Sequence, residues 1–153
     1  MIRCFHPCGL AVCGTVREMT GASGVRARTA SREARDTIRR MSAASAPEDV
    51  RIRFGRRVLS PMITPGEAHF LVVLAATEEE RARHYLRPGG VLISAADFDA
   101  DNLPHASTMG VMLLGALSRR LTIAERCWED AIRAQALARF LAQNLDAFRA
   151  GAK

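Results

Sequence analysis

Apolar and polar residues alternate from Val50 to Phe54, where the chain reads VRIRF. A two-residue period of this kind predicts a strand with one buried face and one exposed face. Gly55 then begins a turn that leads into the apolar pair at 58–59, and Pro61 follows shortly afterwards. We therefore predict a β-hairpin in this part of the chain.

A nearly continuous apolar run covers residues 69–76, which read HFLVVLAA. Such a run is typical of a central parallel strand that is buried on both faces. A second apolar strand is predicted at residues 91–95, and the polar stretch between them has the length of a helix, residues 77–86. The three segments predict one βαβ unit, in which two adjacent parallel strands are joined by a right-handed crossover.

The boundaries of this unit carry their own signals. Thr77 and Glu80 have the spacing of a capping box, in which each side chain accepts a hydrogen bond from an unpaired backbone N–H at the start of a helix. Pro88-Gly89-Gly90 is expected to end the helix in a forced turn. We expect positive φ at one or both of Gly89 and Gly90, and a tight connection at Gly66.

The C-terminal third has helical periodicity. A helix is predicted over residues 107–121, where Gly110 and Gly115 would let another backbone approach closely. Thr122 and Glu125 form a second possible capping box, which would open one long helix to the end of the chain. The apolar positions along this predicted helix are Trp128, Ile132, Leu137, Leu141, Leu145 and Phe148.

The N-terminal part is less regular. Residues 1–27 contain scattered glycines and no apolar period, so we expect a poorly defined segment there and one α/β domain over residues 28–153. The glycines at 21 and 24 do not form a dinucleotide fingerprint, because no apolar strand precedes them. A helix is predicted over residues 29–46, before Pro47.

Charge is distributed unevenly along the 153 residues. The net charge is +6, and residues 1–60 hold 12 arginines against 5 acidic residues. Arginines on the hairpin raise the question of nucleic-acid binding: Arg51, Arg53, Arg56 and Arg57. Basic charge alone is unspecific, and Phe54 is the only aromatic residue nearby, so we favour an exposed or partner-facing surface and no nucleic acid.

The cysteines suggest a metal site without supporting one. Cys4, His6, Cys8 and Cys13 are close in sequence, but zinc sites use paired C-x2–4-C turns, and no second pair is present. Cys127 stands apart. We therefore predict no metal bound by this chain.

No catalytic set of residues can be assigned from the sequence. The acidic residues of the loop at 96–105 alternate, but the glycine and glutamate that an EF-hand requires are absent. The three acidic residues at 78–80 are explained by the dipole of the helix they begin. His69, His84 and His105 have no nearby nucleophile motif, so catalytic and cofactor-binding residues remain unassigned.

Four segments, in this order and spacing, resemble a known family. They are Ser60-Pro61 with Gly66-Glu67-Ala68-His69, then Leu86-Arg87-Pro88-Gly89-Gly90, Leu113–Leu117 and Asn144–Gly151. Over residues 48–151 they are similar to the gamma-type domain of 2-oxoacid:ferredoxin oxidoreductases (pyruvate/ketoisovalerate oxidoreductases), especially the beta subunit of indolepyruvate ferredoxin oxidoreductase. The resemblance implies an α/β fold: a partial Rossmann-like domain with a parallel sheet core, a β-hairpin and C-terminal helices.

The chain departs from the family at identifiable places. The family's glycine-rich turn and its glutamine-arginine-glycine-glycine stretch have no counterpart in residues 1–49, so the N-terminal part is missing or rewritten. His69 stands where aspartate is usual, and Gly110 stands where asparagine is common.

The resemblance also implies a function. It is the oxidative decarboxylation of a 2-oxoacid to its acyl-coenzyme A, with electrons passed to ferredoxin. Thiamine diphosphate, iron–sulfur clusters and coenzyme A would belong to the complex, and none of them to this chain. The implied partner is a larger thiamine-dependent subunit, with ferredoxin reached through the complex, and the chain alone would be inactive.

An alternative from another class is a truncated or diverged non-catalytic α/β module that binds a partner protein. No apolar run approaches the roughly 20 residues that span a bilayer, and the N-terminus lacks a clear signal peptide, so we expect a cytoplasmic protein with no membrane partner.

Overall fold

The computed structural model describes residues 9–14, 50–54, 62–98 and 108–153. Among the described elements, three strands come first, a short helical segment and a fourth strand follow, and the rest are helices. In chain order the elements are β1 (Gly9–Gly14), β2 (Val50–Phe54), β3 (Ala68–Val73), the 3-10 helix η2 (Ala76–Glu78), α2 (Glu79–Arg83), β4 (Leu86–Ser94), the 3-10 helix η3 (Ala95–Asp97), α3 (Met109–Ser118), α4 (Glu125–Gln135), the 3-10 helix η6 (Ala138–Phe140) and α5 (Leu141–Gly151).

The four strands form one mixed sheet in the order β2-β1-β3-β4. The two outer pairs, β1 with β2 and β3 with β4, are parallel, and the central pair of β1 with β3 is antiparallel. The sequence does not predict β1, whose six residues GLAVCG lie between two other strands. The α/β class is confirmed, and part of the N-terminal segment belongs to the sheet.

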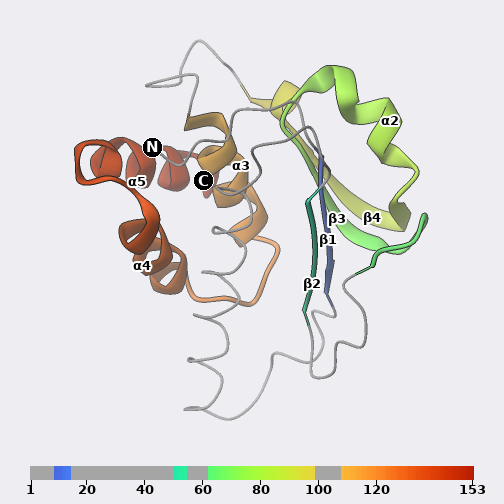
Figure 1. Ribbon diagram of the computed structural model, residues 1–153, viewed down its shortest axis with the longest axis horizontal. Coiled ribbons are helices and arrows are strands. Elements are labelled where there is room, and N and C mark those ends of the chain that lie inside the picture. The colour runs from blue at the N-terminus through green and yellow to red at the C-terminus, as the bar shows by residue number, and fades with distance from the viewer. Residues whose placement is uncertain (1–8, 15–49, 55–61, 99–107) are drawn as a thin grey trace.

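Helices cover both faces of this sheet, as Figure 1 shows: α3, α4 and α5 lie on one side and α2 on the other. Two separate apolar clusters result. We call the larger one the helix-side core; its buried members are Ile52, Phe70, Val72, Ile93, Val111, Leu113, Leu114, Leu117, Leu121, Ile123, Cys127, Trp128, Ala131, Ile132, Ala147 and Phe148. The smaller one, the α2-side core, consists of Ile63, Ala68, Leu71, Val73 and Ala82.

Strand β3 contributes to both cores. Successive side chains of a strand point to opposite faces, so Phe70 and Val72 enter the helix-side core while Leu71 and Val73 enter the α2-side core. Each of the four is at most 5% exposed. The prediction that this strand is buried on both faces is confirmed.

The βαβ unit is present, with a shorter crossover helix than predicted. Strands β3 and β4 are adjacent and parallel, which confirms the predicted pairing. The capping box at Thr77 is wrong, because neither η2 nor α2 has a side-chain cap. The chain already turns at Ala76, so Thr77 lies inside the 3-10 turn, where its side chain cannot precede and cap the helix.

The Pro88-Gly89-Gly90 run lies inside β4 rather than in a loop before it. Strand β4 begins at Leu86, and its register with β3 shifts between the pairs Ala68↔Leu86 and Phe70↔Val91. The extra residues of β4 form a bulge there, and glycine suits such a bulge. Gly89 has φ 72° and Gly66 has φ 78°, so the predicted positive φ is confirmed.

Helix α3 lies directly against α5. The predicted close approach at Gly115 is confirmed, because a Cβ on Gly115 would lie 3.0 Å from the Ala152 nitrogen and 3.1 Å from the Gly151 carbonyl carbon, both backbone atoms. A Cβ on Gly151 would lie 2.7 Å from the carbonyl carbon of Met112. The two glycines thus allow the backbones themselves to touch.

The single long C-terminal helix is wrong, since two helices, α4 and α5, occupy its place. Between them Ala136 and Leu137 are extended, with ψ of 140° at both, and the Leu137 side chain is 53% exposed. The second capping box is wrong as well: the N-cap of α4 is Ala124, and no side chain caps it.

The residues just before α4 form an irregular connection that packs on the helix-side core. Leu121 and Ile123 are both buried in the helix-side core, whereas Thr122 between them is exposed. Alternate burial of this kind keeps the chain out of a helix until Glu125.

Several predictions fall outside the described residues. They concern the second arm of the hairpin at 58–59, the helix at 29–46, the cluster of Cys4, His6 and Cys8, and the Ser60-Pro61 motif. Over the described ranges, no helix has the length and apolarity needed to cross a membrane.

Candidate functional site

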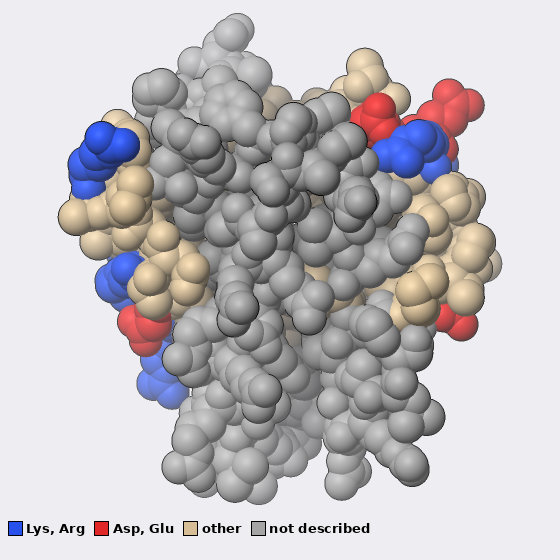
Figure 2. All heavy atoms as spheres, viewed as in Figure 1, with Lys and Arg blue, Asp and Glu red and all other residues tan. Residues whose placement is uncertain are grey.

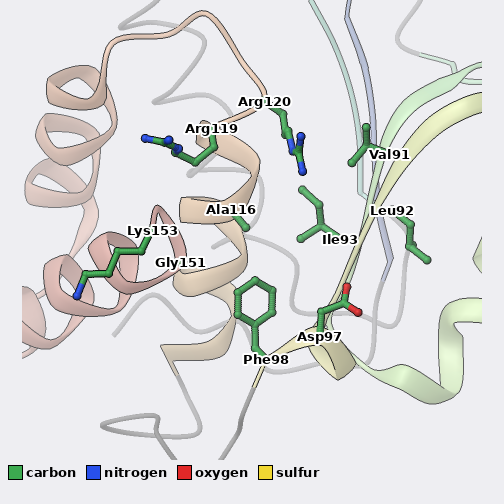
Figure 3. A pocket seen from close by; sticks show the side chains of 10 residues that line it. All are labelled: Val91, Leu92, Ile93, Asp97, Phe98, Ala116, Arg119, Arg120, Gly151 and Lys153. Carbon is green, nitrogen blue, oxygen red and sulfur yellow. The ribbon is translucent and has the colours of Figure 1, made fainter.

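A groove of about 440 Å³ lies between strand β4 and the C-terminal end of α3. Residues from β4, η3, α3 and the end of the chain surround it (Figure 3). The lining residues are Val91, Leu92, Ile93, Asp97, Phe98, Ala116, Arg119, Arg120, Gly151 and Lys153. Apolar side chains of β4 and α3 therefore line it together with charged side chains.

Packing of α3 fixes one wall. The helix ends at Ser118, whose hydroxyl donates a 2.6 Å hydrogen bond to the carbonyl of Gly115. Arg119 and Arg120 follow immediately, and the chain then enters the helix-side core at Leu121. Cations at this position are favourable for α3, because the C-terminal end of a helix carries partial negative charge.

The positive side chains of the rim are not neutralised by neighbours. Arg119, Arg120 and Lys153 are exposed. In the part of the chain that the structure describes, the ion pairs lie elsewhere, on α2 and on α4 and α5. Figure 3 shows the Arg120 guanidinium directed toward β4, above Ile93, while Arg119 and Lys153 extend away from the strand.

Among the described residues that line the groove, Asp97 is the only acidic one. One of its carboxylate oxygens accepts a hydrogen bond of 3.1 Å from the backbone N–H of Ser94, and the Ser94 hydroxyl accepts one of 3.3 Å from Ala96. This reciprocal arrangement is a capping box that holds η3 at the end of β4. Asp97 thus has a structural role, and the described residues that line the groove carry net positive charge, with three cations against one carboxylate.

The charges elsewhere are largely paired. Glu78 binds Arg81 and Glu79 binds Arg83 on α2. Glu129 on α4 accepts hydrogen bonds from Arg133 at 2.7 Å and from Arg149 on α5 at 2.9 Å. These two hydrogen bonds hold the pKa of Glu129 below its ordinary value, and the bond from Arg133 contributes most. In Figure 2, the charged side chains of the described residues are mixed in sign on the α2 flank and more basic on the flank of the C-terminal helices.

The histidines considered in the sequence are not gathered at the groove. His69 is half-buried on β3. His84 is exposed after α2, where its Nδ1 lies 2.7 Å from the carbonyl oxygen of Arg81 and its ring lies 4.1 Å from that of Tyr85. His105 lies outside the described residues. The acidic residues at 78–80 form the first turns of η2 and α2, as their dipole interpretation requires.

The described residues offer no ligand set for a metal or a cluster. In the ranges that the structure covers, no three His, Cys, Asp or Glu side chains come together. Cys127 lies on α4 and is buried in the helix-side core. These residues do not fit an iron–sulfur cluster, so no chemistry is assigned to one here.

The sequence alone does not predict the groove or two buried polar atoms. Nε1 of Trp128 and Nδ2 of Asn144 are buried and have no hydrogen-bond partner. The Arg119-Arg120 pair gave a signal in the sequence, since two cations follow an apolar helix directly, but only the fold brings them beside β4. Comparisons with the models of known families and with the curated proteins give no match for this chain.

Proposed function

We propose that this chain is a gamma-type domain of a 2-oxoacid:ferredoxin oxidoreductase of the indolepyruvate or pyruvate type, working inside a larger complex. The observation that carries the proposal is the order and spacing of the four family-like segments over residues 48–151. The complex would decarboxylate a 2-oxoacid oxidatively to its acyl-coenzyme A and pass the electrons to ferredoxin.

Packing of the third and fourth segments supports the proposal. The Leu113–Leu117 segment lies on α3 and Asn144–Gly151 lies on α5, and the two helices meet at Gly115 and Gly151. A Cβ at either glycine would collide with backbone of the other helix. Two short motifs some 30 residues apart in sequence therefore share one requirement, a glycine where the two helix backbones touch. Unrelated α/β fragments would have no reason to share it.

The first two segments have backbone requirements of their own. Gly66 and Gly89 both adopt positive φ, a conformation that other residues reach only with strain. In the Gly-Glu-Ala-His run, Gly66 lies in the turn just before β3, and in the Leu-Arg-Pro-Gly-Gly run, Gly89 lies in the bulge of β4. The glycines of these two motifs therefore have a structural reason in this chain.

The role of this chain in the complex is positioning rather than chemistry. When bound in the complex, thiamine diphosphate would supply the carbanion chemistry and iron–sulfur clusters would carry the electrons. The described residues do not fit a cluster, and the sequence contains no thiamine motif. The chain would help to assemble the complex or to line a path for its substrate.

Turnover with and without the larger subunit tests this proposal. The assay is the reduction of an acceptor dye with indolepyruvate and with pyruvate, each with thiamine diphosphate and coenzyme A. We expect no turnover by the purified chain, and stimulated turnover when the thiamine-dependent subunit from the same source is added. Robust turnover by the chain alone would contradict the proposal.

A further inference from the structure

Strand β4 ends the sheet in the part of the chain that the structure describes. It pairs with β3 on one side, through the registers Phe70↔Val91 to Val73↔Ser94, and no described strand lies on its other side. Backbone N–H and C=O groups on a free edge are a template for pairing with another extended chain.

The groove opens onto this free edge. Val91 and Ile93 pack against the helix-side core, whereas Leu92 packs against the α2-side core, because alternate residues of a strand face opposite ways. All three nevertheless line the groove. A groove lined by residues from both faces of a strand must run along the backbone edge of that strand. Figure 3 shows these side chains diverging from β4.

Only the second half of β4 is suited to pairing. Pro88 has no N–H to donate, and Gly89 has a positive φ that interrupts the extended conformation. The bulge therefore protects residues 87–90 from edge pairing, as bulges and prolines commonly do. At the other end, the N–H of Ser94 already donates to Asp97. The remaining stretch is Val91–Ile93, about 10 Å long at roughly 3.3 Å per residue. Within it, Leu92 is the residue whose N–H and C=O face outward, because alternate residues of β4 face β3 and the Ser94 N–H faces Asp97.

The charge around this edge selects the occupant. Among the groove's described lining residues, three are cationic, and the one carboxylate caps η3. A second copy of this chain, paired β4 to β4, would bring its own Arg119 and Arg120 against those of the first copy. Like charges brought together in an interface disfavour such a complex.

We propose that the β4 edge and its basic groove bind a short extended segment of a partner protein that carries carboxylate side chains, by strand addition to Val91–Ile93. Backbone hydrogen bonds would supply the pairing, and the guanidinium of Arg120, which is directed toward β4, would select acidic side chains. Arg119 and Lys153 extend away from the strand and add positive potential around it. The inference does not rest on the proposed enzymatic function, because it uses only the geometry and charge of this chain.

Binding of synthetic peptides to the full chain tests the charge requirement. The probe is a fluorescein-labelled eight-residue peptide that alternates glutamate and valine, followed by fluorescence anisotropy. The matched peptide has lysine in place of glutamate. We expect the glutamate peptide to bind at least about tenfold more tightly than the lysine peptide, since like-charge contacts disfavour the latter. Equal binding of both would overturn the proposal.

Methylated peptides test the backbone requirement on the unchanged protein. One peptide is N-methylated at every valine and the other at every glutamate. In a paired strand, alternate N–H groups face the neighbouring strand, so one peptide should lose at least about tenfold in affinity and the other should lose little. If both bind like the parent peptide, strand addition is excluded.

Charge reversal locates the site. The double substitution Arg119→Glu with Arg120→Glu should weaken binding of the glutamate peptide at least about tenfold, whereas Arg126→Glu on α4, which does not line the groove, should change it by less than about twofold. Circular dichroism checks that each variant is folded. Equal effects of the two changes, or a dimer that forms through β4 and excludes the peptide, would overturn the proposal.

Discussion

Substituting Gly115 by alanine should destabilise the protein, although alanine favours helices. Gly115 lies in the middle of α3, where alanine would gain about 1 kcal/mol in helix propensity. The added Cβ, however, would lie 3.0 Å from the Ala152 nitrogen and 3.1 Å from the Gly151 carbonyl carbon, and closer still to the carbonyl oxygen of Phe148. All three are backbone atoms, which cannot rotate away as a side chain can.

Relief of this collision requires the two helices to move apart. Overpacking of this kind costs typically 1–3 kcal/mol, and we take about 3 kcal/mol because all three nearest neighbours are backbone. After subtraction of the gain in propensity, we expect the free energy of unfolding to fall by about 2 kcal/mol. For a chain of this length, that corresponds to a fall in Tm of about 4–8 °C.

Thermal and urea unfolding provide the measurement. Far-UV circular dichroism follows the helices, and Trp128, the single tryptophan, reports on the helix-side core in which it is buried. Ala134→Gly, at an exposed position in the last turn of α4, is the control and should cost less than about 1 kcal/mol, because the propensity penalty of glycine applies in full only in a helix interior. If Gly115→Ala leaves Tm unchanged or raises it, backbone contact between α3 and α5 is refuted.

Three further sets of substitutions give separate tests. Gly151→Ala should cost less stability than Gly115→Ala, because Gly151 lies in the last turn of α5, which can unwind. The double variant should cost less than the sum of the two, since one separation of the helices relieves both collisions. Urea midpoints of the three variants measure this, and strict additivity would contradict it. Glu129→Gln should lower stability by about 1 kcal/mol at pH 7 and by much less at pH 3. Arg133 and Arg149 lower the pKa of the Glu129 carboxylate, so it stabilises the fold above its ordinary pKa and loses this contribution as it is protonated. Asp130→Asn, which alters a more exposed side chain, is the control, and an equal effect of Glu129→Gln at both pH values would contradict the assignment. Gly66→Ala and Gly89→Ala should each cost about 1–2 kcal/mol through backbone strain at positive φ, although both positions have open space around them; unchanged urea midpoints would show that the turns are not strained.

The parts of the fold that could be predicted are those that local pattern determines. Leu71, Val72 and Val73 fill two cores at once, and only an apolar run can do this. Gly66 and Gly89 could be assigned to special backbone conformations because few other residues adopt positive φ. In α3, an apolar helix with Gly115 at its centre indicated close contact with another backbone.

The parts that could not be predicted depend on distant contacts. Strand β1 is six residues of small and apolar side chains, and its place in the sheet comes from pairing with β2 and β3, which lie more than 30 residues away. The break at Ala136 and Leu137 contains no glycine or proline, so nothing in the local sequence marks it. Tertiary packing of α4 and α5 overrides local helix propensity there.

The capping boxes failed for a different reason. Thr77 and Thr122 each have a glutamate three residues later, but a side chain caps a helix only when it occupies the residue just before the first turn. Thr77 lies within a 3-10 turn, and Thr122 lies two residues before the N-cap of α4. Over the described ranges, the capping box that does form is between Ser94 and Asp97, and it holds the acidic residue that lines the groove.

Association of this chain with a thiamine-dependent 2-oxoacid oxidoreductase subunit is the measurement that tests the central proposal most directly, because association must precede any contribution to turnover. Sedimentation velocity of the two purified proteins, separately and mixed, would detect it, with Gly115→Ala as a folded but perturbed variant. The proposal predicts a stable complex for the natural chain, and weaker association for the variant only if α3 or α5 takes part. Two species that sediment independently at micromolar concentrations would contradict the proposal and favour a non-catalytic interaction module.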